Sequence, residues 1–158
     1  MKDAGALKID RLSRLIVRMA RENNLSSGLI LSVMKVESGF RGWATSPRGA
    51  LGLMQLMPET GAWMAQRYGI GWDGPATLLD EEKNTTLGIR YLAYLRDKYS
   101  GDLEKALSAY NRGPAKVDGE VSGGKNGTLK YFRKVRYSLP RFALGDIRGR
   151  RSNVASIE

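Results

Sequence analysis

The sequence predicts an all-α protein, a single helical domain with long glycine-rich loops. Apolar residues recur at spacings of three and four along most of the chain, as they do on one face of an α-helix. No segment shows sustained alternation of apolar and polar residues, and no internal repeat is visible, so neither strands nor a repeat architecture is indicated. Glycine makes up 19 of the 158 residues, well above the usual ~7%, and this excess predicts long loops.

The first two predicted helices lie near the N-terminus. The apolar face of the first is formed by Ile9, Leu12, Leu15, Ile16 and Met19. The pair Asn23-Asn24 ends this helix, and Ser26 or Ser27 is a suitable N-cap for the second. The second helix is the most apolar in the chain and stops near Gly39. A loop is expected over residues 39–52, which hold four glycines and one proline.

Three more helices are predicted from capping signals. The third, residues 58–68, starts with a proline at its first position and is followed by a glycine. Residues 69–79 contain glycine and proline and are expected to form a loop. The fourth helix extends from its cap Asp80 to Tyr99, and the fifth from its cap Asp102 to Gly113.

The C-terminal part is predicted to contain one more helix. Residues 118–127 hold four glycines and are expected to be mobile. Thr128 is a suitable cap for a final helix that stops at Pro140. The prediction therefore assigns residues 1–142 to one domain and residues 143–158 to a basic, flexible tail.

The composition excludes several classes of function. The chain has no cysteine and no histidine, which excludes a disulfide framework, Cys- or His-based metal sites, a cysteine nucleophile and a Ser-His-Asp triad. No cofactor and no metal are expected, and acid–base chemistry would fall to Asp, Glu, Lys or Tyr. The formal charge of +10 predicts a polyanionic partner, which could be nucleic acid, an anionic membrane surface or an acidic polymer such as the bacterial cell wall.

No targeting or membrane segment is predicted. The N-terminal residues contain no long apolar run, so they do not resemble a signal peptide. No stretch approaches the ~18 apolar residues of a membrane span. These features predict a soluble chain, and we expect it to act as a monomer.

Glu37 is a carboxylate in an unusual position. It follows apolar residues near the end of the most apolar helix, just before a polar loop. Burial and the negative end of the helix dipole both disfavour its charged form, which should raise its pKa. A raised pKa is what a general acid requires at neutral pH. The structural alternative is a carboxylate paired with Lys35 or Arg41 at a helix end.

Two other segments contain polar side chains that are candidates for ligand binding. Gln55 is the one polar side chain in the apolar turn of residues 49–58, where it could serve a backbone carbonyl or hold a ligand. Tyr110 and Asn111 lie at the end of a predicted helix, just before Gly113-Pro114. The asparagine could be a simple C-cap and the tyrosine a core residue, since each feature alone is more often structural than functional.

These candidate residues lie in three sequence motifs that follow one another along the chain. They are Glu37-Ser38-Gly39-Phe40, Gly52-Leu53-Met54-Gln55-Leu56-Met57-Pro58 and Ala109-Tyr110-Asn111-x-Gly113-Pro114. In this order and spacing, with Gln55 eighteen residues after Glu37, they resemble the soluble lytic transglycosylase family of peptidoglycan-cleaving enzymes. A fourth family element, Thr-x-x-Tyr, is similar to Thr128–Tyr131. The resemblance covers most of the chain, about residues 25–139, and implies the lysozyme-like helical fold of this family and of goose-type lysozyme.

The resemblance implies a role for seven residues of this sequence. It implies Glu37 as the sole catalytic acid and base. The substrate-binding positions that it implies are Ser46, Gln55, Met57, Tyr110, Asn111 and Tyr131. In the family the serine hydrogen-bonds near the acid, the glutamine and methionine line sugar subsites, and the tyrosine–asparagine pair faces the glutamate and the substrate N-acetyl group. The late tyrosine lies near the glutamate.

Two positions depart from the family pattern. Arg112 replaces a residue that is usually small, and Gly127 stands where a glutamate is common before the Thr-x-x-Tyr element. Neither position is the acid, so the departures concern the detail of the sugar subsites.

The implied reaction cleaves the MurNAc-β-1,4-GlcNAc bond of peptidoglycan strands. One carboxyl group protonates the glycosidic oxygen and then, as a base, takes the proton of the C6 hydroxyl, so that 1,6-anhydro-MurNAc forms without water. A goose-type lysozyme-like hydrolase on the same fold is the alternative. Ordinary glycosidases use two carboxylates, and no second one lies in the motifs.

Two further interpretations explain less of the sequence. A nucleic-acid-binding helical domain would account for the charge but would leave Glu37 and Gln55 unexplained, so no nucleic-acid partner is expected. A wall-binding scaffold without activity would not need an intact Glu37. The expected place of action is the bacterial cell wall, in the periplasm or cell envelope. Because no signal peptide is predicted, the chain is expected to be phage-encoded, for example an endolysin, or a trimmed mature form.

Overall fold

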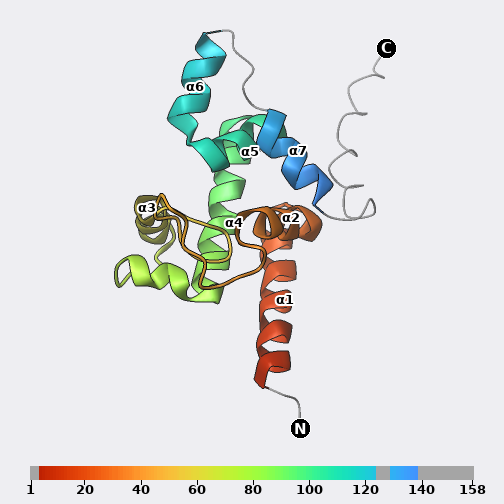
Figure 1. Cartoon of the computed structure of the whole chain (residues 1–158), viewed down its shortest axis with the longest axis vertical. Helices are drawn as coiled ribbons and strands as arrows, with labels where there is room; N and C mark the ends of the chain where they lie inside the picture. Colours follow the sequence, from red (N-terminus) through yellow and green to blue (C-terminus); the bar gives the residue numbers. More distant parts are fainter. Residues whose placement is uncertain (1–3, 124–128, 139–158) are drawn as a thin grey trace.

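The computed structural model describes residues 4–123 and 129–138, and over this part of the chain it confirms the all-α fold class (Figure 1). In chain order the elements are α1 (Ala4–Glu22), α2 (Ser27–Ser38), α3 (Pro58–Tyr68), the 3₁₀ helix η1 (Pro75–Leu79), α4 (Glu81–Lys98), α5 (Leu103–Arg112), α6 (Pro114–Ser122) and α7 (Leu129–Tyr137). The described residues contain no strand, only isolated bridges that join Leu51 to Thr45 and to Leu56. None of the described helices is both long and apolar enough to cross a membrane.

Capping residues fix the helix ends where the sequence predicts them. The hydroxyl of Ser26 and the carboxylates of Asp80 and Asp102 each accept a hydrogen bond from a first-turn backbone N–H of α2, α4 and α5. Gly39 and Gly69 end α2 and α3 in the left-handed conformation, with φ of 60° and 63°. The end of α2, which carries Glu37, is therefore set by local sequence.

The region between Gly113 and the last helix differs from the prediction. Residues 118–122 were expected to be mobile, but they belong to α6. The helix forms because Val117 is fully buried in the core, and because the carboxylate of Glu120 pairs with the guanidinium of Arg112 on α5. Burial of one apolar side chain and this ion pair outweigh the low helix propensity of Gly119.

Two smaller expectations are also corrected. The loop expected over residues 69–79 contains η1, which places its own Leu78 fully buried in the core. Ile9, expected on the apolar face of α1, is 69% exposed. The N-terminal end of α1 extends beyond the other helices (Figure 1), and its contacts to α4 there are ion pairs of Lys8 and Arg11 with Glu81 and Glu82 rather than apolar packing of Ile9. Thr128, Pro140 and the predicted tail 143–158 lie outside the described residues.

Helix α4 lies at the centre of the molecule and borders two apolar cores (Figure 1). One core packs α1, α2 and α7 against α4, and the other packs α3, η1 and α6 against it. The segment between α2 and α3 contributes to both, since Leu53 and Met54 lie in the first core and Leu56 in the second. Three apolar anchors thus fix residues 51–57 beside the end of α2.

Candidate active site

Glu37 lies in the last turn of α2, half-buried, and its carboxylate accepts a hydrogen bond from the hydroxyl of Tyr131 at 2.5 Å. The two cations named as structural partners are engaged elsewhere. The Nε of Arg41 donates to the carbonyl of Ser38 at 2.8 Å, and the ammonium of Lys35 lies 5.9 Å from the ring centre of Phe40. The helix-end ion pair of the structural alternative is therefore not what holds Glu37.

Burial raises the pKa of Glu37 above its ordinary value, in the direction that the sequence predicts. Removal of the carboxylate from water is the largest cause. The hydrogen bond from Tyr131 and the positive charge of Lys134 act in the opposite direction and lower the pKa. The net result is a carboxyl group that holds its proton to higher pH than an exposed glutamate, as a general acid must.

Tyr131 and Tyr110 are two phenols whose pKa values respond to the charge of this carboxyl group. Burial is the main cause that raises the pKa of both hydroxyl groups well above the ordinary value, and the negative charge of Glu37 adds to the shift. Both residues therefore remain protonated hydrogen-bond donors at neutral pH. Tyr131 donates to Glu37, and Tyr110 donates to the carbonyl of Met54 at 2.8 Å.

Side chains from three helices hold the backbone of residues 51–57. Ser38, on α2 next to Glu37, donates to the carbonyl of Leu53 at 2.7 Å. Tyr110, on α5, holds the next carbonyl along the segment. Asn84, on α4, is fully buried and makes three hydrogen bonds. Its oxygen accepts from the N–H of Met54, and its nitrogen donates to the carbonyls of Leu51 and Leu78, all at 2.8–2.9 Å.

Two glycines allow the segment to approach α4 this closely. Gly52 has φ of 79°, a left-handed conformation, and a Cβ there would collide with the amide of Asn84 and the carbonyl of Leu78. Gly88, on α4, leaves space for the side chain of Met54, whose sulfur would lie only 2.5 Å from a Cβ. Any side chain at either position would push the segment away from the helix.

The side chain of Gln55 donates hydrogen bonds to backbone carbonyls. This is one of the two roles that the sequence suggests, the other being to hold a ligand. It adopts a left-handed conformation with φ of 49°, and its amide nitrogen donates to the carbonyls of Ala44 at 3.0 Å and Gly52 at 2.9 Å. These bonds join the two ends of the loop around the site. The next candidate, Met57, is 42% exposed at the N-cap position of α3, where it can contact a ligand.

Ser46 lies in the loop between α2 and α3, and Asn111 lies on α5. Within the described residues, neither side chain forms a hydrogen bond with Glu37. The hydroxyl of Ser46 accepts a hydrogen bond from the N–H of Ala50 at 3.0 Å and so shapes the turn of residues 46–50. Asn111 is exposed in the last turn of α5, next to Tyr110. Arg112, the departure from the family pattern, forms two 2.7 Å contacts with the carboxylate of Glu120, so its guanidinium is turned towards α6.

Two acidic residues outside the three motifs have partners away from Glu37. Asp118 accepts a hydrogen bond from Tyr99 at 2.8 Å and pairs with Lys98 at 3.0 Å. Asp73 is highly exposed, 4.0 Å from the ammonium of Lys83. Across residues 4–123 and 129–138, no group of three or more acidic side chains is placed to hold a metal ion.

Sequence reasoning missed the positioning roles of Ser38 and Asn84. Ser38 was quoted only as part of a motif, although a serine beside the acid at a helix end is a natural donor to a neighbouring loop. Asn84 lies four residues before Gly88, on the same face of α4. An asparagine on the buried face of the central helix must find partners, and this requirement is the signal that could have identified it.

Comparison with known proteins adds independent information. A family model described as the transglycosylase SLT domain matches residues 14–131. The soluble lytic murein transglycosylase of Salmonella typhimurium is 34% identical over 130 residues, which cover 80% of this chain and 20% of that protein. The membrane-bound lytic murein transglycosylase C of Actinobacillus pleuropneumoniae is 37% identical over 112 residues, 65% of this chain and 31% of that protein.

Solved structures give the same result for the fold. An inactive mutant of the lytic transglycosylase Slt from Pseudomonas aeruginosa superimposes with a TM-score of 0.66 and 27% identity, covering 83% of this chain and 21% of that one. The 70-kDa soluble lytic transglycosylase in complex with bulgecin A gives a TM-score of 0.68 and 25% identity over 83% of this chain and 21% of that one. The chain thus spans about a fifth of the length of the soluble relatives that it matches.

Proposed function

Because this chain belongs to the transglycosylase SLT domain family, we propose that it cleaves peptidoglycan glycan strands as a lytic transglycosylase. The proposed bond is the β-1,4 linkage between MurNAc and GlcNAc, and the proposed product ends in 1,6-anhydro-MurNAc. Glu37 is the proposed acid and base. The proposed place of action is the cell envelope, where this polymer lies.

The observation that carries the proposal is the half-buried carboxyl group of Glu37, whose pKa is raised by burial and whose charge acts on two neutral tyrosines, Tyr131 and Tyr110. A protonated Glu37 can donate to the glycosidic oxygen as the bond to the sugar breaks. The carboxylate left behind is then a base for the C6 hydroxyl of the same sugar. Attack by this hydroxyl closes the anhydro ring and returns the proton to Glu37, so atoms and charge balance without water.

The positions of the other acidic residues support ring closure over hydrolysis. A hydrolase needs a second carboxylate, about 6.5–9.5 Å from the acid to activate water or about 5–5.5 Å away as a nucleophile. Asp118 and Glu120 are instead tied to Lys98 and Arg112, and the segments 52–58 and 109–114 contain no acidic residue. An intramolecular hydroxyl also gains the effective concentration of a bound neighbour.

The other candidate residues are proposed to bind the strand. Tyr110 and Asn111 end α5 beside the site, and Met57 is exposed at the start of α3. We place the N-acetyl group near the first pair and a sugar ring against the methionine. Gln55 and Ser46 act by holding the loop in shape, through the hydrogen bonds to Ala44, Gly52 and Ala50.

Product analysis tests the reaction. Purified peptidoglycan is digested in ¹⁸O-labelled water and the muropeptides are examined by mass spectrometry. We expect anhydro ends without label. Reducing MurNAc ends that carry the label would make the protein a lysozyme-type hydrolase and overturn the proposed product.

A further inference from the structure

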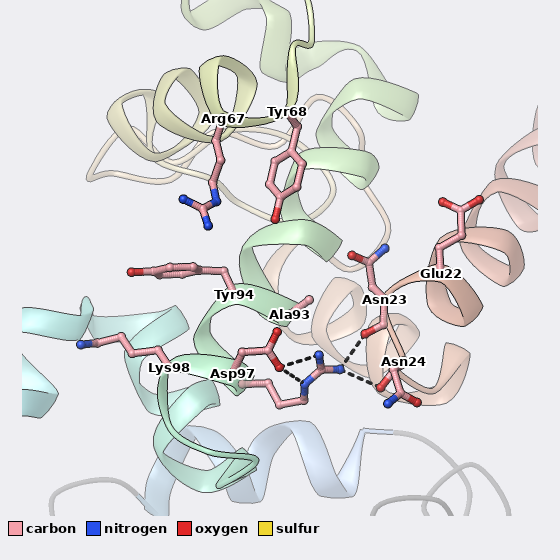
Figure 2. Close-up of a pocket in the computed structure, with 10 residues that line it drawn as sticks. Glu22, Asn23, Asn24, Arg67, Tyr68, Ala93, Tyr94, Asp97 and Lys98 are labelled. Atoms are coloured by element: carbon pink, nitrogen blue, oxygen red, sulfur yellow. Dashed lines mark hydrogen bonds and ion pairs between the residues drawn. The ribbon is translucent and has the colours of Figure 1, made fainter.

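A concave surface lies away from the candidate active site. It is a cavity of about 430 Å³ between the C-terminal ends of α1 and α3 and the C-terminal half of α4 (Figure 2). None of the seven candidate site residues lines it. The volume falls within the range of about 300–1,000 Å³ that small-molecule sites occupy.

Two tyrosines and one small residue give the cavity its shape. Tyr68, at the end of α3, and Tyr94, on α4, both line the cavity, and Ala93 lies next to Tyr94 on α4 (Figure 2). Arginine side chains fix both rings across the two helices. The guanidinium of Arg67 lies 5.6 Å from the ring centre of Tyr94, and that of Arg90 lies 4.1 Å from the ring centre of Tyr68.

The opposite wall is polar. The side chains of Glu22 and Asn23, at the end of α1, and of Asp97, on α4, line it. Arg96 anchors this wall, since its guanidinium donates to the carbonyls of Asn23 and Asn24 at 2.6 and 2.7 Å and to Asp97 (Figure 2). Amides and carboxylates opposite fixed aromatic rings suit a ligand that has both apolar faces and many hydroxyl groups.

A line of aromatic rings connects this cavity to the candidate active site. Trp63, on α3, is 39% exposed, and its ring centre lies 4.9 Å from that of Tyr94. Trp63 and Tyr94 both contact Tyr91, which in turn lies 5.4 Å from Tyr110 of the site. The surface formed by Trp63, Arg67, Tyr68 and Tyr94, here called the aromatic strip, is therefore packed against Tyr110 through the buried ring of Tyr91.

We propose that the aromatic strip and its cavity form a second saccharide-binding site, which holds an uncleaved part of the same amino-sugar strand. The proposal rests on the proposed function for the identity of the polymer. Sugar rings stack on the exposed faces of Trp63 and Tyr94, and the polar wall accepts their hydroxyl and amide groups. Within the described residues Arg67 has no ion pair, so its charge is available to the acidic groups that the strand carries. Such a site would keep a long strand bound between cuts.

The three tryptophans provide a direct readout of binding. In a Glu37→Gln variant, which is expected not to cut, ¹⁵N-labelled indole signals are followed during titration with N-acetylchitotetraose, a soluble amino-sugar oligomer. Trp63 lies on the strip, Trp72 packs against the core glycine Gly61, and Trp43 is exposed on the loop after α2. We expect the Trp63 signal to move and the Trp72 signal to stay. A Trp63 signal that does not move at saturating oligomer overturns the proposal.

Charge-reversal variants test the same site on the intact polymer. Arg67→Glu should weaken binding to purified peptidoglycan about tenfold, while Arg21→Glu, an equal charge change at an exposed position of α1, should change it much less. Tyr94→Ala should abolish the Trp63 response, and Arg67→Glu is the independent check if that variant folds poorly. Equal effects of Arg67→Glu and Arg21→Glu would show that only net charge matters and would overturn the site.

The two proposals fail separately. If the wild-type protein releases no muropeptides but the Trp63 signal still responds to oligomer, the proposed reaction is wrong and the saccharide site stands. If anhydro products form while the strip variants bind like the wild type, the second site is wrong and the reaction stands.

Discussion

The carboxyl group of Glu37 and the neighbouring segment 51–57 are held in opposite ways. The segment is fixed by hydrogen bonds from Ser38, Asn84 and Tyr110, on three different helices, and by side chains in both cores. Among the described residues, the carboxyl group accepts a side-chain hydrogen bond from the hydroxyl of Tyr131, and its burial disfavours its charged form.

The difference matches the different requirements of a binding surface and of an acid. A wall that binds a rigid sugar strand benefits from several independent tethers, because no single thermal motion can release it. An acid that must give up and regain a proton needs few strong hydrogen bonds to its charged form. Such bonds would lower its pKa, and it would no longer be protonated at neutral pH. Substitutions in the wall should therefore change stability, and substitutions around the acid should change activity and its pH dependence.

The largest expected effect is on activity at the acid. Glu37→Gln keeps the shape of the side chain and removes the proton that moves, so lysis of purified cell walls should fall by at least ~10²–10⁴-fold. The matched control is Glu59→Gln, on the exposed first turn of α3, which should lyse walls like the wild type. More than a tenth of wild-type activity in the Glu37 variant, with a normal circular dichroism spectrum, would show that Glu37 is not the acid.

The next effect is on the stability of the wall. Asn84→Ala leaves the buried N–H of Met54 and the carbonyls of Leu51 and Leu78 without their recorded partner. The free energy of unfolding in urea should fall by about 2–4 kcal/mol. Asn111→Ala, at an exposed position, should change it by less than about 0.5 kcal/mol. Equal losses in the two variants would contradict the tether assigned to Asn84.

A third effect concerns the pH dependence of activity. The hydrogen bond from Tyr131 favours the charged form of Glu37 and lowers its pKa, so Tyr131→Phe should raise that pKa further. The fall of kcat/KM with rising pH should then move to higher pH, because Glu37 of the free enzyme stays protonated to higher pH. Tyr137→Phe, at an exposed position on the same helix, is the control. A fall that moves to lower pH, or does not move, would contradict the role of this hydrogen bond.

The smallest effect is on stability at the acid itself. Because the folded-state pKa of Glu37 lies above its unfolded value, the folded protein binds this proton more tightly, and stability falls as pH rises between the two values. Glu37→Gln does not titrate, so it should be more stable than the wild type at about pH 7, with the difference shrinking towards about pH 4. Denaturation curves at several pH values measure this. A wild type that gains stability relative to the variant as pH rises would mean that the carboxylate is stabilised by the fold.

The sequence by itself determined most of the helix ends and pointed to Glu37 as the candidate acid. Ser26, Asp80 and Asp102 cap α2, α4 and α5, and the glycine after α2 ends it just beyond Glu37. These signals are local, because a cap acts on backbone groups within one turn and apolar periodicity repeats within a few residues. The raised pKa of Glu37 was predictable for the same reason, since its burial follows from its place in an apolar helix.

Only the tertiary structure decided what surrounds that acid. Tyr131 reaches Glu37 across 94 residues of sequence, Tyr110 reaches Met54 across 56, and Asn84 reaches Met54 across 30. The helix α6, which its glycines argued against, is likewise fixed by Val117 in the core and by the pair of Arg112 with Glu120. Such contacts depend on how the helices pack around α4, and packing is set by the fit of many side chains at once. No local pattern records that fit.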